Sequence, residues 1–274
     1  LQMATIQPAR CYGLCHLGMI APGRQADLVI LDNVTDLNVV DVYHCGKRII
    51  KEEKTEVKIC PPYLKNTVHV SGFSEERLKL KHPGTKARVI QMQEKQIVTK
   101  AVLEEVPWVE ENGGKYFAPD REYQKIAVIE RHKNTGKMGV GIVKGYGICG
   151  GAIASSVSHD SHNIIVVGDN DHDMALAVKE MIRTQGGYTL VCNGEIYGTL
   201  PLPVMGLISD AGYERVNEAL ARMIPKAHEM GVKEGFDPFI TLSFMALPVI
   251  PEIRVTPRGI YLVNEDSIIR TPFG

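Results

Sequence analysis

The sequence predicts an α+β fold in which strands outnumber helices and two helices are long. Short apolar runs that alternate with polar residues or end at glycine-containing turns recur from residue 87 onwards, a pattern typical of strands. Two segments, 171–185 and 211–230, instead carry apolar residues at helical spacing. A tight turn at 133–136 separates two further apolar runs and indicates a hairpin.

The first 50 residues are predicted to contain the end of a helix and three strands. Residues 4–14 read as the last part of a helix that Gly13 ends. The apolar run 26–32 predicts a buried strand, and 39–46 predicts a second. A third strand at 47–50 would follow across a glycine-containing hairpin turn.

A boundary zone is predicted at residues 51–86, because this stretch is charged and repeatedly interrupted by helix- and strand-breaking residues. The interruptions are Pro61, Pro62, Gly72, Pro83 and Gly84.

The elements after the boundary can be placed one by one. Alternating residues predict strands at 87–92, 96–103, 124–131, 138–145 and 188–192. The helix at 171–185 has acidic residues near its start and ends at Gly186–Gly187, as the helix dipole and glycine capping favour. The helix at 211–230 ends at Gly231, and an apolar segment at 239–251 precedes two last short strands.

The composition excludes several classes of partner. Lys and Arg total 31 against 32 Asp and Glu, and the formal net charge of -1 gives no reason to expect nucleic acid or an anionic membrane surface. No run of about eighteen apolar residues is present, so no segment is expected to span a bilayer. The six cysteines form no C-x-x-C pair and suggest reduced thiols in the cytoplasm.

The segment 147–173 carries the main candidate site. Within it, His159, Asp160, His162 and Asn163 are surrounded by small residues that let a ligand approach the backbone. Side chains of these types can bind a metal, transfer a proton or hydrogen-bond a heterocycle, and we interpret the four as catalytic candidates. The alternative is a polar turn that satisfies its own backbone. The two histidines, three positions apart, would share a face only in a helix.

Other polar or glycine-rich segments favour structural roles. Residues 169–173 lack the glycine and distal glutamate of a calcium loop and are better explained as a helix cap. The Gly139-x-Gly141 pattern lies inside the predicted hairpin, where no phosphate-binding loop is expected. The charged residues Glu130–Lys133 could face a partner or substrate, or simply form a solvated hairpin end. Glu195 and Ser209–Asp210 are weaker candidates.

Several segments resemble known families. Residues 4–46 resemble the segment that follows the barrel in amidohydrolase-superfamily enzymes and completes a small β-sandwich. Four later blocks are similar to the C-terminal domain of the adenine deaminase family. They are Ile129–Gly136, Gly151–Ile164, Leu202–Asp210 and Leu242–Pro251.

The resemblance implies hydrolysis of adenine to hypoxanthine and ammonia, in purine salvage and adenine catabolism, by water activated on Mn²⁺ or Fe²⁺. In the superfamily the metal ligands lie in a TIM-like barrel that begins with an H-x-H motif, and this sequence contains no H-x-H. No cofactor is therefore expected on this chain alone, which should be inactive without the barrel. His159, Asp160, His162 and Asn163 would then form one wall of an active site whose metal lies elsewhere, or would stabilise the domain or a dimer interface.

Two functional hypotheses follow. In the first, the chain is a C-terminal fragment of adenine deaminase: residues 1–60 are the post-barrel helix end and β-sandwich segment, and residues 61–274 are the C-terminal domain. The start at Leu1, within a helix already under way, favours this hypothesis. In the second, a free-standing purine-binding or docking domain acts with a separate barrel subunit. The expected partners are adenine, the barrel and a second copy in a homo-oligomer.

Overall fold

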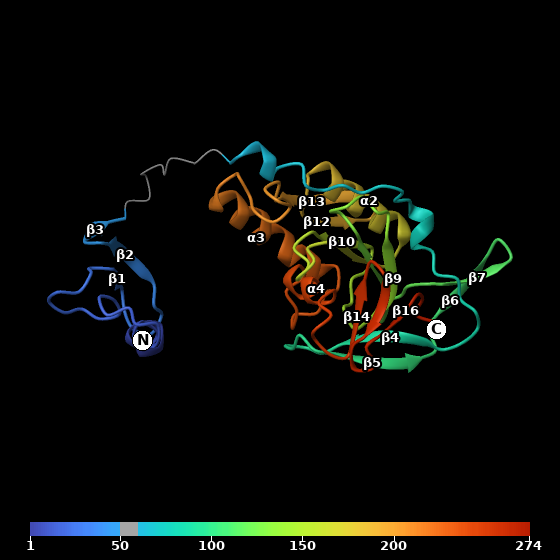
Figure 1. Ribbon diagram of the computed structural model, residues 1–274, viewed down its shortest axis with the longest axis horizontal. Helices are drawn as coiled ribbons and strands as arrows, with labels where there is room; N and C mark the ends of the chain where they lie inside the picture. The colour runs from blue at the N-terminus through green and yellow to red at the C-terminus, as the bar shows by residue number, and fades with distance from the viewer. Residues whose placement is uncertain (50–59) are drawn as a thin grey trace. The chain divides into compact units, whose positions relative to one another are not determined.

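A computed structural model describes residues 1–49 and 60–274 of the chain (Figure 1). Its contacts divide the chain into two units, Leu1–Ile59 and Cys60–Gly274. The predicted boundary zone overlaps this division, and its residues 51–59 lie outside the described residues, as does Ile50 of the third predicted strand.

The first unit contains the helix end and the strands that its sequence predicts. A short 3-10 helix, Gln2–Ala4, leads into α1 (Ile6–Cys11), and Gly13 follows with a φ of +67°. Strands β1 (Leu28–Leu31), β2 (Val39–His44) and β3 (Lys47–Arg48) form an antiparallel sheet in the order β1-β2-β3. Val29, Ile30, Val39 and Val40 each expose 45–62% of their surface. The sheet therefore presents uncovered apolar side chains. The prediction of a buried strand at 26–32 is wrong as to burial, because β1 lies at the edge of a three-stranded sheet with Val29 and Ile30 exposed.

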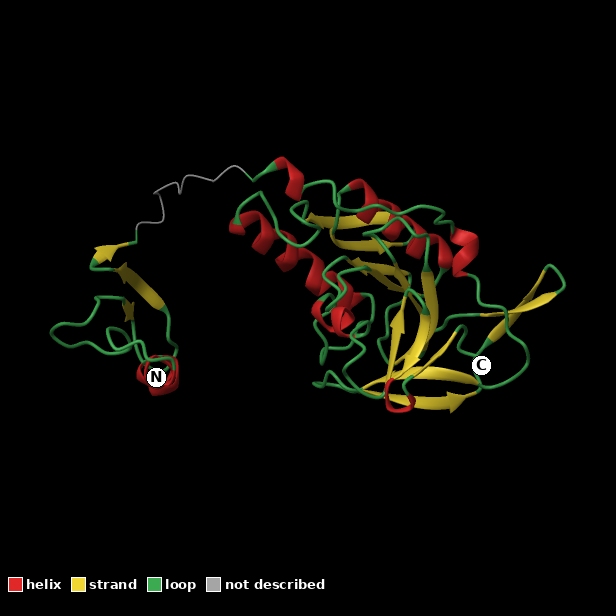
Figure 2. Ribbon diagram, viewed as in Figure 1, coloured by secondary structure: helices red, strands yellow, loops and turns green. Residues whose placement is uncertain are grey.

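The second unit is built on an eight-stranded sheet in the order β13-β12-β10-β11-β8-β9-β4-β5. Every neighbouring pair is antiparallel except β4 and β9. The strands are β4 (Ala87–Met92), β5 (Thr99–Glu104), β8 (Tyr123–Ile129), β9 (Met138–Lys144), β10 (Gly151–Ser155), β11 (Ile164–Gly168), β12 (Gly187–Cys192) and β13 (Glu195–Pro201). The predicted hairpin is confirmed as β8 and β9, and Figure 2 shows how strands dominate this unit.

Both faces of the large sheet are covered, because side chains alternate between two apolar clusters. Ile126 and Val128 belong to one cluster, and Ala127 and Ile129 belong to the other. The second cluster includes the buried face of α2 (Asp171–Arg183), which contacts β10, β11 and β12. The first cluster includes residues of α3 (Tyr213–Glu229), α4 (Ile240–Phe244) and the last strands. The unit is thus a layered α+β structure with a central sheet.

The two long helices are confirmed, and all four of their ends lie within two residues of the predicted positions. The side chain of Asn170 accepts a hydrogen bond from the Asp173 backbone N–H at 2.8 Å, so this acidic segment caps α2 as expected. Helix α3 begins at Tyr213 and continues through Pro225. Among the described residues, no helix is both long and apolar enough to cross a membrane.

Several smaller elements complete the second unit. Three last strands were found where two were predicted: β14 (Ile253–Thr256), β15 (Gly259–Leu262) and β16 (Ser267–Ile269), which pair in that order. A separate hairpin joins β6 (Trp108–Glu111) to β7 (Gly114–Phe117). Short 3-10 helices cover Pro62–Leu64, Glu75–Leu78 and Val263–Glu265.

Candidate functional site

The four predicted site residues lie in the connection between β10 and β11, two neighbouring antiparallel strands inside the large sheet. Every residue of both strands is buried, which explains their Gly, Ala, Ile and Val content. The connection forms a single α-turn, in which the His162 N–H donates to the Ser158 carbonyl at 2.5 Å. His162 itself has a φ of +49°. The site is therefore a strand-to-strand turn and not a helix, and residues 158–162 are called the site turn below.

This turn brings the two histidine rings together without a helix. Their ring centroids lie 5.8 Å apart. The His159 ring stacks on Phe244 of α4 at 5.2 Å, and the His159 N–H donates to the Ser243 carbonyl at 3.0 Å. The side chain of His159 is 39% exposed, whereas that of Asp160 is 83% exposed. His159 is thus held against α4, while Asp160 projects into solvent.

His162 is the more enclosed of the pair. Burial, reinforced by the neighbouring charges of His159 and Arg131, lowers the pKa of His162 below 6.5. Its Nδ1 is buried without a hydrogen-bond partner among the described residues, and the same holds for the Ser158 Oγ. Buried polar atoms are normally satisfied, so two such atoms in one turn indicate a place where a further group or water binds.

Asn163 is directed to a different neighbour. The residue is 5% exposed, and its Oδ1 accepts a hydrogen bond from the Arg131 backbone N–H at 3.3 Å. The four predicted residues therefore divide into the histidine pair, an exposed aspartate, and an asparagine engaged with the end of β8.

Arg131 belongs to the charged segment Glu130–Lys133, which the sequence offered as a partner- or substrate-facing segment or a solvated hairpin end, but its own side chain is buried. It follows β8 directly and is 1% exposed. Its guanidinium donates to the carbonyls of His162, Thr67 and Met205. Burial lowers its pKa to about 10, so it remains charged near neutral pH. A buried arginine bonded to three carbonyls fixes the backbone of the turn. The signals for it in the sequence were its place in this charged segment and at a strand end.

Glu130 organises the neighbouring turn between β8 and β9. Its carboxylate accepts from the N–H groups of His132, Lys133 and Thr135 at 2.6, 2.7 and 2.9 Å, and from the Thr135 hydroxyl at 2.8 Å. Burial opposes ionisation, but these four hydrogen bonds outweigh it and lower the pKa of Glu130 to about 2. The segment Glu130–Lys133 is thus a braced turn with a buried arginine inside it.

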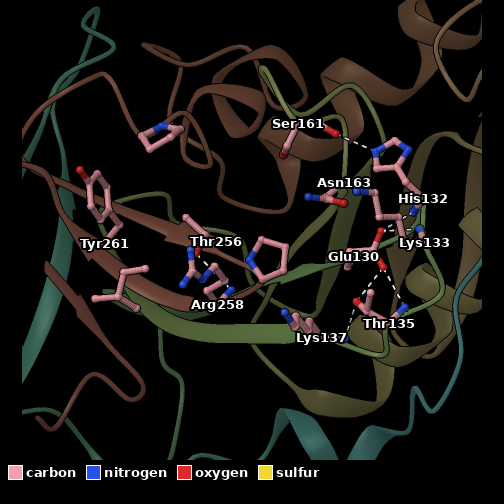
Figure 3. A pocket seen from close by; sticks show the side chains of 13 residues that line it. Glu130, His132, Lys133, Thr135, Lys137, Ser161, Asn163, Thr256, Arg258 and Tyr261 are labelled. Atoms are coloured by element: carbon pink, nitrogen blue, oxygen red, sulfur yellow. Dashed lines mark hydrogen bonds between the residues drawn. The ribbon is translucent and has the colours of Figure 1, made fainter. Parts of the chain in front are cut away.

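A pocket of about 580 Å³ lies beside this turn (Figure 3). The His132 Nε2 bonds to the Ser161 carbonyl at 2.7 Å and must donate, because a carbonyl only accepts. This bond links the braced turn to the site turn, and residues of both turns line the pocket. The lining residues are Glu130, His132, Lys133, Thr135, Lys137, Ser161, Asn163, Pro248, Thr256, Pro257, Arg258, Tyr261 and Ile268.

The site does not contain the ligands of a hard divalent metal. Among residues 1–49 and 60–274, the one group of three or more potential ligands close enough to share an ion is Asp27, His44 and Cys45 in the first unit. A thiolate there suits softer metals than Mn²⁺. Among the described residues, His159 and His162 belong to no such group.

The comparisons with known proteins cover this whole region. A family model described as the adenine deaminase C-terminal domain matches residues 96–267, which is more than half of the chain. The chain belongs to this family. An amidohydrolase family model matches residues 1–59. The site turn, the braced turn and every pocket residue except Ile268 fall within the adenine deaminase C-terminal domain match.

Curated relatives named adenine deaminase match nearly the whole chain. A protein named adenine deaminase from Desulfitobacterium hafniense is 50% identical over 98% of this chain and 47% of its own length. One of the same name from Nitratidesulfovibrio vulgaris is 42% identical over 97% of this chain and 46% of its own length. Adenine deaminase 2 from Carboxydothermus hydrogenoformans is 40% identical over 98% of this chain and 47% of its own length. The chain thus spans about half the length of these relatives.

Proposed function

We propose that this chain is the C-terminal portion of an adenine deaminase that hydrolyses adenine to hypoxanthine and ammonia. The observation that carries the proposal is the match to relatives named adenine deaminase at 40–50% identity across almost every residue of the chain. The matched part of this chain includes the site turn and the braced turn. A cytoplasmic location fits the six cysteines, all of which are free.

The domain assignment forms part of the proposal. We assign residues 1–60 as the helix end and β-sandwich segment that follow an amidohydrolase barrel, and residues 61–274 as the C-terminal domain. The amidohydrolase match over residues 1–59 supports the first assignment. The uncovered Val29, Ile30, Val39 and Val40 also support it, because strands with exposed apolar residues are expected to pack against further structure.

The family implies a metal, and we propose that Mn²⁺ or Fe²⁺ is held by residues of an N-terminal barrel in a longer protein. We also propose that this longer protein forms a homo-oligomer. Among the described residues, the one group of three potential ligands is the exposed Asp27, His44 and Cys45 of the first unit, and the histidine pair belongs to no such group. When bound in the barrel, such an ion would activate the water for hydrolysis. The chain's own contribution is then limited to binding adenine, excluding water and moving a proton.

His159 and His162 are the residues best suited to that contribution. His162 is neutral near pH 7 because its pKa is lowered, so its imidazole can accept a proton or a hydrogen bond. His159 is partly exposed beside it and stacked on Phe244, a position from which it can meet a flat heterocycle. Asp160 is close enough to influence the pair, and Asn163 helps to fix the turn through Arg131.

The experiment measures ammonia release from adenine by the 274-residue chain with Mn²⁺ or Fe²⁺, alone and after fusion behind the N-terminal portion of the Desulfitobacterium hafniense relative. The proposal predicts no turnover by the chain alone and turnover by the fusion. An active chain alone would contradict the assignment of the metal to the barrel. An inactive, folded and metal-loaded fusion would contradict the assignment of adenine deamination.

A further inference from the structure

The pocket beside the braced turn has a charge that adenine deamination does not use. Three cations line it, Lys133, Lys137 and Arg258, and all three residues are exposed. None of the three forms an ion pair within the part of the chain that the structure describes. Adenine is neutral, so this concentration of positive charge indicates an anionic ligand.

The acidic residue in the pocket does not neutralise these cations by direct contact. Glu130 already accepts four hydrogen bonds from its own turn, two on each carboxylate oxygen. Its hydrogen-bonding capacity is therefore directed at the backbone of residues 132–135 and the Thr135 hydroxyl. Lys133, Lys137 and Arg258 remain available to a ligand.

The lining of the pocket also includes apolar and aromatic side chains. They are Pro248, Pro257, Tyr261 and Ile268, which come from the segment after α4 and from the small β14–β16 sheet. The Tyr261 hydroxyl donates to Asp266 at 2.7 Å, which fixes the orientation of its ring. Flat apolar side chains of this kind bind the face of an aromatic ring.

Asn163 supplies a buried polar group aimed into the same space. The residue is 95% buried, and its Oδ1 is engaged with the Arg131 N–H. Its Nδ2 has no hydrogen-bond partner among the described residues, and Figure 3 shows this nitrogen directed toward the side of the pocket formed by Thr256 and Tyr261. This amide donor is therefore free to donate a hydrogen bond to a ligand in the pocket.

We propose that this pocket binds a nucleoside monophosphate, with the phosphate at Lys133, Lys137 and Arg258 and the base against Pro257 and Tyr261. A phosphate monoester carries close to two negative charges and three acceptor oxygens, so the three cations that line the pocket favour it over a carboxylate. The base offers the acceptor that the Asn163 amide lacks. The pocket volume of about 580 Å³ falls in the range for ligands of this size. This second binding site does not depend on the proposed deaminase activity.

Isothermal titration calorimetry of the 274-residue chain tests the proposal with adenosine 5′-monophosphate, adenosine and inorganic phosphate as separate probes. We expect the monophosphate to bind one-to-one, and each partial probe to bind at least about tenfold more weakly, because each lacks one set of contacts. Phosphate binding as tightly as the monophosphate, or adenosine doing so, would overturn the proposal, as would the absence of monophosphate binding.

Variants assign the binding to this pocket. Replacing Lys137 and Arg258 together by Gln should weaken monophosphate binding at least about tenfold, since each removes a charged contact. The matched control is the Lys86→Gln, Arg121→Gln pair, which removes two exposed cations outside the pocket. Asn163→Asp keeps the acceptor for the Arg131 N–H but replaces the free donor by a carboxylate, and should also weaken binding. Equal binding by the Lys137/Arg258 variant and its control would overturn the assignment.

Discussion

The guanidinium of Arg131 donates a hydrogen bond to the main-chain carbonyl of His162. This bond joins the end of β8 to the turn that carries both histidines, and further bonds from the same guanidinium reach Thr67 and Met205. Arg131 forms no ion pair within the described residues. Its charge is therefore stabilised by carbonyl dipoles, and this side chain is one of the groups that hold the site turn in place.

Replacing Arg131 by Met should lower the free energy of unfolding by about 2–4 kcal/mol, because three carbonyls in partly buried positions lose a charged donor. Urea unfolding monitored by circular dichroism measures the change. The control is Arg121→Met, which removes an exposed arginine that forms no ion pair among the described residues, and should cost less than about 1 kcal/mol. Equal losses for the two variants would contradict the role assigned to Arg131.

Gly206→Ala should destabilise the protein through a direct clash. A Cβ at Gly206 would lie 2.8 Å from the Arg131 Cζ, and the residue has a φ of +71°. The matched control is Gly194→Ala, which has a φ of +81° but no atom within 4 Å of the added carbon. The melting temperature should fall further for Gly206→Ala than for Gly194→Ala, by an amount corresponding to about 1–3 kcal/mol. A smaller loss at Gly206 would show that the arginine can move aside.

Acid should remove a contribution of Glu130 to stability. The folded-state pKa of Glu130, about 2, lies below its ordinary value of 4.5. Its contribution is therefore complete above pH 4.5 and is lost as the pH falls from about 4.5 toward 2. Urea unfolding at pH 7 and pH 3 should show a smaller pH-dependent loss for Glu130→Gln than for the unmodified protein. An identical loss in both proteins would exclude Glu130 as a source of the acid sensitivity.

His162 should titrate below 6.5, because burial penalises its charged form. With the folded-state pKa lower than the unfolded one, protonation disfavours folding, and this destabilisation appears as the pH falls below about 6.5. NMR spectra of the imidazole nitrogens across pH 4–8 report the midpoint directly. A midpoint at or above 6.5 would show that His162 is not enclosed as described.

Elements defined by local sequence were predictable, whereas elements defined by distant pairing were not. Helix α2 was located because its cap at Asn170 and its apolar spacing are local signals. Strand β10 was not predicted as a strand, since Gly151, Ala152 and Ala154 have weak strand preference, and pairing with β11 and β12 defines it. The β6–β7 hairpin was also missed, although Asn112–Gly113 at its turn is a hairpin signal.

The same distinction applies to the site. The residue types at 159–163 indicated function, but the proximity of the two rings depends on an α-turn with a positive φ at His162. No periodicity in the sequence encodes that turn. The burial of Arg131 was equally hidden, because its carbonyl partners come from residues 67, 162 and 205. Residues that act through long-range backbone contacts leave little trace in the sequence.

The most direct test of the central claim measures adenine turnover by the fusion of this chain behind the N-terminal portion of its Desulfitobacterium hafniense relative. We predict that replacing His159 and His162 together by Ala lowers kcat by about 100-fold or more, the range for loss of a general acid–base group, with an unchanged melting temperature. His172→Ala, at a histidine that is 69% exposed outside the turn, should leave kcat unchanged. Normal turnover by a folded double variant would contradict the account.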